Sequence, residues 1–596
     1  MRAISGHSQG SEDTEVIPMR MGRPPRLGAS THHQAKSSGA ICMSFHIAII
    51  GGGVSGLSAA YYLQQQALSS GQALDITVYE RKPQFGGNAD TVVVKLGTLQ
   101  NGQGQPERAF IRWADLGVND VNLATYVKLA ALMKDIGYLQ HMKPLQDTTS
   151  YFTADGNEYL TDDAALYNGV SDARFNLAQT DGGELSKLIA VVHQHAIDLV
   201  APPAGGPPPV PVSYTVAHYF DSCIANPEGM LAATARRLQI QINWGDPAIP
   251  ARIARIRDEI YYPRISAMYF TDNETGPGGM PLQSPFQYYR VQEGGVTPDR
   301  RYFEYGSQHW LQALARWMEQ HSTDKVKVRH HMGAPVKVTI SPASAVVTPS
   351  DAPPEHVDLV LMALHADDAL HALEFKGIPT DTAHAIQATL HQVRYTRSYG
   401  VCHTDDRLLP RNRNVWRTYN VLVHSPAQQV QPYRMSYVEN FHQNDPLTPS
   451  LDHIGLPMFF TSLLPDLKQV QANAVLTRLN GDEVPQNLRD ALPHLAQSHA
   501  PAHHPQTGYS HELGATHAHL AGKAWALFKH NVLNVNCIDA QSRMQAINED
   551  NAQRPLMPLF FGGGWTNGAG LHEQCLAQSQ LLTQWAQRYI NRHQAA

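Results

Sequence analysis

The stretch from Phe45 to Glu80 constrains the fold more than any other part of the chain. It begins with a short apolar run, Phe45–Ile50, that is typical of a buried strand. Three glycines follow in GxGxxG spacing, and a helix with apolar periodicity is expected from Val54 to about Leu68. A second expected strand, Asp75–Tyr79, ends at Glu80. A strand, a glycine turn, a helix and a second strand with a terminal acid predict the start of a dinucleotide-binding βαβ unit.

Each residue of this motif has a physical task in binding a dinucleotide. Gly51 allows the tight turn, Gly53 lets the backbone approach a pyrophosphate, and Gly56 lets the helix and strand pack closely. The helix N-terminus offers unpaired N–H groups and a partial positive charge to the phosphates. Glu80 lies where a carboxylate can accept hydrogen bonds from an adenosine ribose. The alternative is a glycine-rich turn in an unrelated α/β fold.

The composition favours a large intracellular protein that does not bind nucleic acid. The chain has 596 residues, of which 42% are hydrophobic, and this is ample for more than one domain. Its formal net charge of −6 gives no basic surface of the kind that binds nucleic acid. The cysteines have neither metal-ligand nor CxxC spacing, so a reduced, cytoplasmic setting is expected. They are Cys42, Cys223, Cys402, Cys537 and Cys575.

Residues 1–43 are expected to form a disordered tail. They are polar, rich in Ser, Gly, His and Arg, and contain no apolar signal core. Met43 lies just before the first expected strand, so either Met1 or Met43 is the start of translation. No apolar run in the sequence approaches the roughly 20 residues of a membrane span.

Two strand–glycine–helix units lie at opposite ends of the chain. The second has an expected strand at Met557–Phe561, a glycine turn, and a helix from about Leu571 to Arg592. Parallel strands need long crossover connections, so segments that are distant in sequence can share one sheet. We therefore expect an α/β fold, α+β overall, in which both ends of the chain meet at one cofactor.

The middle of the chain is expected to cover that cofactor. A helix is predicted at Val121–Tyr138, and the Pro-rich stretch Ala201–Val212 predicts a loop or stiff linker. A buried strand is predicted at Val357–Leu364 and a β-rich region at residues 390–465. Residues 485–530 are predicted to be helical.

Blocks spread over nearly the whole chain after the tail carry a family resemblance. They are Gly51–Glu80, Gly86–Gly87, Ala114–Gly137, Asp358–Leu370, Val401–Asn420 (VCHTDDRLLPRNRNVWRTYN) and Leu559–Gln578 (LFFGGGWTNGAGLHEQCLAQ). On these blocks the chain resembles the flavin-containing amine-oxidase-like oxidoreductases, and most closely a bacterial branch of predicted NAD/FAD-binding proteins. The last two blocks are the most specific, and the final one resembles a motif that closes over the flavin.

The resemblance implies non-covalently bound FAD and an amine-oxidase/glutathione-reductase-like fold, with a discontinuous Rossmann-like domain. That FAD-binding domain would comprise residues 44–118, 301–375 and 546–596, interleaved with a substrate domain of residues 119–300 and 376–545. The helix near Leu571 would present its N–H groups and dipole to the flavin, and Trp565 would wall the ring. The expected cofactor contacts are Gly51, Gly53, Ser55, Gly56, Glu80, Arg81, Gly86, Gly87, Asn88, Val336, Gly564, Trp565, Gly570, Leu571 and His572.

Several departures distinguish the chain from true amine oxidases. Asn88 follows the second glycine pair where Arg or His is common, and Gly562–Gly564 replace an acidic residue. We find no clear counterpart of the flavin-facing lysine, nor of the cysteine that tethers FAD covalently in monoamine oxidases. Cys575 is expected to pack.

The expected activity is a two-electron oxidation in which a hydride passes from a C–H bond of an organic substrate to flavin N5. By analogy with the resembled branch, a small-molecule or lipid substrate is expected, in particular an unsaturated or methylated fatty-acyl chain, and peripheral membrane contact stays open. The alternatives are an amine oxidase, a redox-neutral flavin-dependent isomerase of an acyl double bond, and a flavin-binding protein without catalysis.

No catalytic residue is assigned from the sequence, but His365, His403, His572 and Glu573 are weak candidates. His403 and Asp405 can form a hydrogen-bonded pair, in which the carboxylate orients a general base. For each of these residues the alternative is a structural role in a cap, a turn or a packed core.

Three further groups of side chains have both a functional and a structural interpretation. Arg411 and Arg413 can hold a carboxylate or phosphate, although solvated loop arginines are more common. Aromatic residues can line an apolar cavity or pack in the core; they are Tyr261, Tyr262, Tyr269, Phe270, Tyr288 and Tyr289. No metal site is expected from a histidine-rich region without HExxH spacing or a Cys partner; it contains His499, His503, His504, His511, His517 and His519.

Overall fold

The fold is described from a computed structural model of the chain, for residues 44–99, 108–145, 148–153, 158–160, 183–203, 206–269, 271, 274–293, 297–423, 434–479, 483–486, 489, 518–554 and 557–595. The expected tail (1–43), Phe270 and the histidines from His499 to His517 lie outside these residues. Residues 44–596 form one of the two units into which the chain divides, and the description concerns this unit. Within the described ranges, no helix has the length and apolarity needed to cross a membrane.

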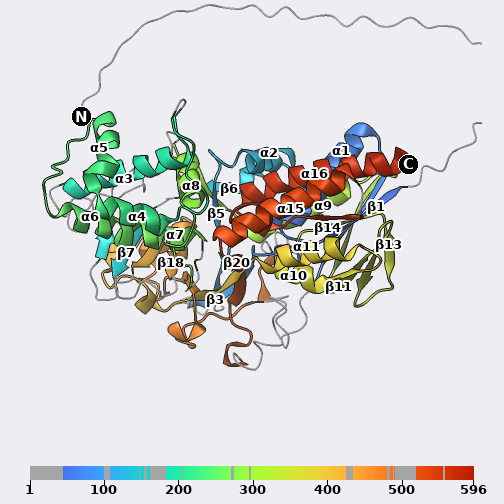
Figure 1. The fold of residues 1–596 in the computed structure, drawn as a ribbon. Helices are drawn as coiled ribbons and strands as arrows, with labels where there is room; N and C mark the ends of the chain where they lie inside the picture. Colours follow the sequence, from blue (N-terminus) through green and yellow to red (C-terminus); the bar gives the residue numbers. More distant parts are fainter. Residues whose placement is uncertain are drawn as a thin grey trace, which may run out of the picture. The chain divides into compact units, whose positions relative to one another are not determined.

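A five-stranded, wholly parallel sheet unites segments from both ends of the chain (Figure 1). Its strand order is β10 (Val326–Met332), β2 (Leu74–Glu80), β1 (Phe45–Ile50), β14 (Leu359–Met362) and β21 (Leu559–Phe561). β14 pairs in parallel with both β1 and β21. The central strands are nearly continuous apolar runs, as is typical of a sheet that is covered on both faces. The expectation that both ends of the chain share one parallel sheet is confirmed.

Alternate residues of β1 face two different hydrophobic clusters, because successive side chains of a strand point to opposite faces. Ile47 and Ile49 pack in one cluster, and Ala48 and Ile50 pack in the other. Helices of the first cluster are α1 (Val54–Ser70), α9 (Ser307–Gln320) and α16 (His572–Ala595), and those of the second are α10 (Ala366–Ala372), α11 (Thr380–His391) and α15 (Val535–Gln553).

The first and last helices of the sheet region, α1 and α16, lie side by side (Figure 1). α1 begins after Gly53 and ends at Gly71, which adopts the left-handed conformation (φ +73°) that closes many helices. The hydroxyl of Ser58 in α1 donates to the hydroxyl of Ser579 in α16 at 2.8 Å. Segments more than 500 residues apart are thus bonded within one layer.

Four further sheets are present among the described residues. A seven-stranded sheet has the order β20-β16-β19-β18-β17-β7-β8, and a four-stranded sheet the order β13-β12-β11-β15. The smaller sheets are β3-β4 and β5-β9-β6. The strands are β3 (Thr91–Leu99), β4 (Arg108–Asp115), β5 (Asp120–Asn122), β6 (Met142–Pro144), β7 (Thr149–Thr153), β8 (Glu158–Leu160), β9 (Arg300–Phe303), β11 (Val336–Ile340), β12 (Ala345–Pro349), β13 (Glu355–Val357), β15 (Leu373–Phe375), β16 (Tyr395–His403), β17 (Tyr419–Val423), β18 (Met435–Val438), β19 (Phe460–Leu464) and β20 (Trp525–Asn531).

A helical layer precedes β9 in the chain and packs on the second hydrophobic cluster. In this layer a single π-helical segment, Ile256–Tyr261, leads into α7. Across the described residues as a whole, the helices not yet given are α2 (Val127–Asp135), α3 (Glu184–Val200), α4 (Val216–Ala225), α5 (Pro227–Arg237), α6 (Ile249–Arg255), α7 (Tyr262–Tyr269), α8 (Gln283–Glu293) and α12 (Glu439–His442).

Three sequence predictions for the middle of the chain are wrong in part. The helix expected from Val121 covers only Val127–Asp135, because residues 120–122 form β5 and pair with β9. Residues 525–530, expected to be helical, belong to β20, which pairs antiparallel with β16. The strand expected at Val357–Leu364 is divided at Asp358, whose Oδ2 accepts from the N–H of His46 (2.7 Å), so the chain passes from β13 to β14 in a different sheet.

Candidate functional site

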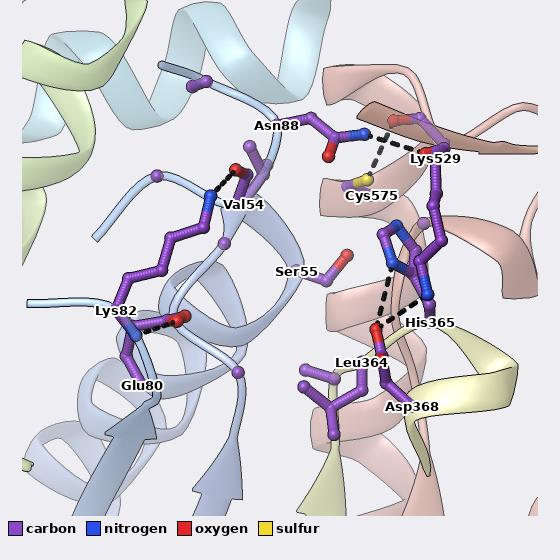
Figure 2. Close-up of a pocket in the computed structure, with 18 of the residues that line it drawn as sticks. Val54, Ser55, Glu80, Lys82, Asn88, Leu364, His365, Asp368, Lys529 and Cys575 are labelled. Atoms are coloured by element: carbon purple, nitrogen blue, oxygen red, sulfur yellow. Dashed lines mark hydrogen bonds and ion pairs between the residues drawn. The ribbon is translucent and has the colours of Figure 1, made fainter. Parts of the chain in front are cut away.

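A cavity of about 450 Å³ lies at the carboxyl ends of the parallel strands (Figure 2). Gly51, Arg81 and Ala363 directly follow β1, β2 and β14, and all three line it. Ligands of open parallel sheets bind at this edge. Every expected cofactor contact except Gly56 and Trp565 lies in the cavity wall: Gly51, Gly53, Ser55, Glu80, Arg81, Gly86, Gly87, Asn88, Val336, Gly564, Gly570, Leu571 and His572.

The glycines of the first turn differ in how much room the surrounding protein leaves for a side chain. Gly51 has φ +113°, and a Cβ there would lie 2.5 Å from the carbonyl oxygen of Ala363. A Cβ at Gly56 would lie 1.8 Å from the carbonyl oxygen of Gly51, so Gly56 lets α1 pack closely on the turn. At Gly53 the nearest atom to a Cβ is the Cα of Gly87, at 3.5 Å, which is an ordinary contact. Protein packing alone therefore does not require glycine at position 53.

The N-terminus of α1 opens onto the cavity without a capping side chain. Gly53 is the N-cap residue and makes no side-chain hydrogen bond, and the first turn contains no acidic residue. Gly53, Val54 and Ser55 all line the cavity. The N–H groups of this first turn and the dipole of a 17-residue helix suit a phosphate or pyrophosphate.

Glu80 is fixed at the end of β2 by two backbone N–H groups. Its Oε2 accepts from Gly52 (2.8 Å) and its Oε1 from Lys82 (2.9 Å). Each oxygen keeps a second lone pair for a ligand hydroxyl, as a ribose contact requires. Lys82 donates from Nζ to the carbonyl oxygen of Gly87 (2.9 Å) and so holds the second glycine pair in place (Figure 2).

A second glycine turn, between β21 and α16, forms another wall of the cavity. Gly570 has φ +78°, and a Cβ there would lie 2.9 Å from the Cα of Gly564, so the turn closes on itself. Oε1 of Gln574 accepts from the N–H groups of Ala569 and Leu571, both at 3.1 Å, and thereby sets the start of α16.

Trp565, which was expected to wall the flavin ring, does not lie in the cavity wall. Its side chain is 1% exposed and packs in the hydrophobic cluster that contains Ala48 and Ile50. Its carbonyl oxygen accepts from Nε2 of Gln541 at 2.8 Å, which fixes the turn with the indole directed into the core. A glycine-rich turn predicts close backbone approach, but not the side to which its one large residue points.

His572, the first residue of α16, stays a candidate because it lines the cavity. It is 5% exposed, and its ring packs edge-on against Trp310, with centroids 5.4 Å apart. Its Nε2 has no hydrogen-bond partner in the part of the chain that the structure describes. Burial lowers the pKa of this imidazole to about 4, so it is neutral near pH 7 and able to donate or accept one hydrogen bond.

We expect the free energy of unfolding to fall as the pH decreases from about 6.5 towards 4. Burial lowers the pKa of seven described histidines, five of them to about 3 or 4, and the unfolded chain protonates these five below about 6.5 while the folded chain does not. Each of these five histidines therefore lowers the free energy of unfolding by about 1.4 kcal/mol for each pH unit of acidification in this window. Urea unfolding followed by circular dichroism at several pH values measures this, and a constant free energy between about pH 6.5 and 5 would contradict it. The pKa is lowered to about 4 for His403 and His572 and to about 3 for His193, His309 and His530.

Two of the catalytic candidates have structural roles instead. Glu573 accepts from the N–H groups of Lys128 (3.0 Å) and Leu129 (3.1 Å) and so caps α2. His403 bonds through Nε2 to the hydroxyl of Ser462 (2.8 Å), and its Nδ1 accepts from the backbone N–H of Asp405 (3.0 Å). Neither Glu573 nor His403 lies in the cavity wall.

The carboxylate of Asp405 does not orient His403. It accepts from Arg407 at 2.8 and 2.6 Å and from the N–H of Gln471 at 2.9 Å. Arg413 pairs with Asp406 at 3.1 Å on the surface. His403, Asp405 and Arg413 therefore take part in structural bonds outside the cavity wall.

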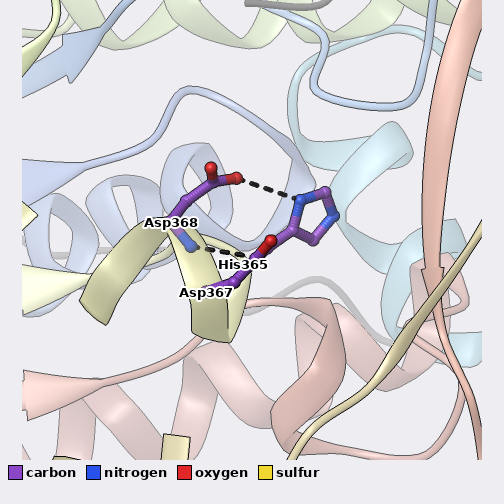
Figure 3. A group of neighbouring side chains, drawn as sticks. All are labelled: His365, Asp367 and Asp368. Carbon is purple, nitrogen blue, oxygen red and sulfur yellow. Dashed lines mark hydrogen bonds and ion pairs between the residues drawn. The ribbon is translucent and has the colours of Figure 1, made fainter. Parts of the chain in front are cut away.

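One group of described side chains, His365, Asp367 and Asp368, has the spacing of a metal site (Figure 3). The ammonium of Lys529 lies 2.7 Å from Asp367 and 3.1 Å from Asp368, where a bound cation would be held. Nδ1 of His365 lies 3.3 Å from Oδ2 of Asp368, and Arg81 lies 3.4 Å from its Oδ1. Burial opposes ionisation of Asp368, but these partners lower its pKa. The group is a paired charge cluster, and His365 and Lys529 both line the cavity.

Lys529 is a site residue that the sequence did not reveal. It belongs to β20, the strand that was expected to be helix, and its side chain is 2% exposed. Nδ2 of Asn88 donates to its carbonyl oxygen at 3.3 Å, which connects β20 to the second glycine pair (Figure 2). A lysine inside the apolar run of Trp525–Asn531 was the available signal, because a buried ammonium needs paired carboxylates.

The aromatic residues of the helical layer divide between core and cavity. Tyr261 and Tyr289 are fully buried in the second hydrophobic cluster, as the structural alternative predicted. Tyr269, at the end of α7, lines the cavity together with Met268 and Tyr126. One end of the cavity is therefore largely apolar and aromatic.

Comparison with known proteins finds a family match for the segment that contains the first glycine turn. The family model of an NAD(P)-binding Rossmann-like domain matches residues 49–116. This stretch contains the first glycine turn, α1, β2 and the second glycine pair. Residues 49–116 are thus similar to an NAD(P)-binding Rossmann-like domain. No curated protein sequence matches the chain.

Solved structures of putrescine oxidase are similar to the whole chain at low identity. Wild-type putrescine oxidase bound to putrescine is 14% identical, with a TM-score of 0.47, and the match covers 91% of this chain and 98% of that one. A triple mutant from a redesign of cofactor binding in the same enzyme is 12% identical, with a TM-score of 0.47 and coverage of 91% and 99%. At these values no property of those enzymes is transferred to this chain.

Proposed function

We propose that the protein is an FAD-dependent oxidoreductase with FAD bound non-covalently in the cavity. The observation that carries the proposal is that two glycine turns from opposite ends of the chain line one cavity, each at the N-terminus of a long helix. Two such termini suit a ligand with a diphosphate at one end and an electron-accepting ring at the other. The resemblance of Leu559–Gln578 to a motif that closes over a flavin favours FAD over NAD.

The state of Cys575 supports non-covalent binding. This cysteine lines the cavity, but its Sγ donates to the carbonyl oxygen of Gly570 at 3.2 Å. Burial raises the pKa of the thiol to about 11, so it stays protonated and is a poor nucleophile near neutral pH.

In this proposal the bound flavin supplies the two-electron chemistry. The first turn of α1 holds the diphosphate, and Glu80 accepts hydrogen bonds from the ribose. The N-terminus of α16 lies against the ring, where its N–H groups and dipole favour negative charge. Neutral His572 offers one hydrogen bond, while Met268 and Tyr269 exclude water from the reacting end.

We further infer that the substrate is an uncharged, apolar organic molecule, such as an unsaturated or methylated fatty-acyl chain. Lys529 and Asp120 both line the cavity and are already paired, Lys529 with Asp367 and Asp368, and Asp120 with Arg300. An ammonium group of an amine substrate would have to break such a pair or stay uncompensated.

The experiment that tests the function is a cofactor assay followed by an anaerobic reduction screen. The purified full-length protein is expected to be yellow and to release FAD on heating. Under anaerobic conditions, acyl lipids should bleach the flavin, whereas putrescine and other amines should not. Bleaching by amines alone would support an amine oxidase, lipid conversion without bleaching would support the isomerase, and a colourless protein would contradict the proposal.

A further inference from the structure

Asp120, His442 and Glu439 form a row of buried ionisable side chains behind the cavity. Their side chains are 8%, 1% and 1% exposed, and of the three only Asp120 lies in the cavity wall. Nε2 of His442 lies 3.9 Å from Oδ2 of Asp120, and Nδ1 lies 3.9 Å from Oε2 of Glu439. The imidazole therefore lies between a carboxylate at the cavity and a carboxylate in the core.

The row is not a closed hydrogen-bond network. The two ring nitrogens of His442 and the Oε1 atom of Glu439 have no hydrogen-bond partner among the residues that the structure describes. An unpaired buried polar group costs about 1–3 kcal/mol, so a purely structural network would be expected to pair these atoms. Each imidazole nitrogen is about 1 Å beyond hydrogen-bonding distance of a carboxylate, so a small shift at either side makes one bond or the other.

Residues around His442 hold Asp120 in place and add further charged groups near the imidazole. Arg300 from β9 pairs with Oδ1 of Asp120, and the hydroxyl of Tyr419 from β17 donates to Oδ2 at 2.6 Å. Asp115 from β4 also acts on His442 through its charge, and its carboxylate accepts from the N–H of Ser307 at 2.9 Å. Two tyrosine rings pack against the imidazole, those of Tyr302 (5.8 Å) and Tyr437 (6.3 Å).

We propose that Asp120, His442 and Glu439 are a relay that moves one proton between the cavity and the buried carboxylate of Glu439. The relay rests on the proposed function, because it serves a two-electron oxidation in the cavity. In such an oxidation one substrate bond breaks with its electron pair leaving as hydride, and a second bond gives up a proton. That proton binds to the Asp120 carboxylate. His442 takes it at Nε2 and releases the proton of Nδ1 to Glu439, which becomes a carboxylic acid.

The acidities favour movement of a proton from Asp120 towards the inner groups. Burial opposes ionisation of Asp120, but Arg300, His442 and Tyr419 lower its pKa to about 2, so a proton does not stay there. Burial raises the pKa of Glu439, and although burial opposes protonation of His442, Asp120 and Glu439 raise its pKa, so both inner groups hold a proton more readily than Asp120. His442 and Glu439 act through Asp120 and are positioning residues, whereas Asp120 is the group that meets the ligand.

The pH dependence of the midpoint potential of the bound FAD tests the relay without any substrate. Uptake of one proton per two electrons changes the equilibrium tenfold per pH unit, which is about 30 mV for a two-electron couple. Across neutral pH the wild-type potential should fall more steeply than that of Glu439→Gln by about 30 mV per pH unit. His442→Gln should lose the same slope. Glu374→Gln, which changes an exposed carboxylate of β15, should keep the wild-type slope.

Infrared difference spectra on reduction identify the group that takes the proton. A protonated-carboxyl band should appear in the wild type and in Asp115→Asn, and it should be absent in Glu439→Gln. Loss of the band in Asp115→Asn instead would overturn the assignment, because burial raises the pKa of Asp115 to about 7 and makes it the nearest rival acceptor.

The outcomes separate the relay from the proposed function. Equal slopes in the wild type and in the folded variants that retain FAD would overturn the relay and leave the flavin proposal standing. A wild-type protein without FAD would overturn the proposed function. If Glu439→Gln fails to fold, His442→Gln carries the test, and thermal unfolding of each variant shows which one to use.

Discussion

Replacing Gly53 with valine is expected to abolish cofactor retention while leaving the protein folded. The backbone at Gly53 is extended (φ −85°, ψ −171°), which valine adopts without strain, and its Cβ would make only an ordinary contact with Gly87. The two methyl groups would occupy the space at the N-terminus of α1 where the diphosphate is expected. We expect binding to weaken by at least about 100-fold, or about 2.7 kcal/mol. FAD content after gel filtration and the thermal unfolding temperature measure the two effects separately.

Gly245→Val is the matched control for this substitution. Gly245 lies in an exposed loop, and a Cβ there would contact only Oδ1 of Asn243, at 3.5 Å. This variant should keep the FAD content of the wild type. A Gly53→Val protein that retains one FAD per chain would show that the first turn does not bind the diphosphate.

Gly56→Ala should fail in the opposite way, by destabilising the fold. The added Cβ would lie 1.8 Å from the carbonyl oxygen of Gly51, so α1 must move away from the turn or the turn must open. Overpacking of this kind costs about 3 kcal/mol or more when backbone atoms must shift. The free energy of unfolding in urea measures the loss. Ser69→Ala, in the exposed last turn of the same helix, should leave that free energy nearly unchanged.

The contrast between these two variants tests whether Gly53 and Gly56, three residues apart at the start of α1, have different roles. If Gly56→Ala is as stable as the wild type, the close packing of α1 on the first turn is wrong. If Gly53→Val unfolds, its space belongs to the protein core and not to a ligand. Either result would remove the structural basis for placing a dinucleotide at the N-terminus of α1.

Local patterns predicted the elements that position the cavity. The strand, turn and helix from Phe45 to Ser70 depend on short-range signals, namely an apolar run, glycines at fixed spacing and helical periodicity. The same signals placed β21 and α16 close to their observed bounds. The joining of both units in one sheet followed from the geometry of parallel strands.

The orientation of single side chains, and pairings between distant strands, could not be predicted in the same way. Trp565 belongs to a turn that was correctly placed, yet its ring points into the core. Lys529 reaches the cavity only because β20 pairs with β16, more than 100 residues earlier in the chain. The sequence left Glu573 available for catalysis, but in the structure its carboxylate caps the N-terminus of α2. Each of these depends on contacts between segments that are distant in the sequence, and no local pattern in either segment reveals the contact.

The sheet order has a consequence for how the protein is made. β1 and α1 leave the ribosome early, whereas β21 and α16, which complete the central sheet and one wall of the cavity, are the last elements described. In a growing chain, the N-terminus of α1 can therefore be available to a diphosphate long before the opposite wall of the cavity has formed. Tight capture of the proposed cofactor has to wait until β21 and α16 have been synthesised, and until then the edge of β14 that β21 will cover stays open to mispairing with other strands.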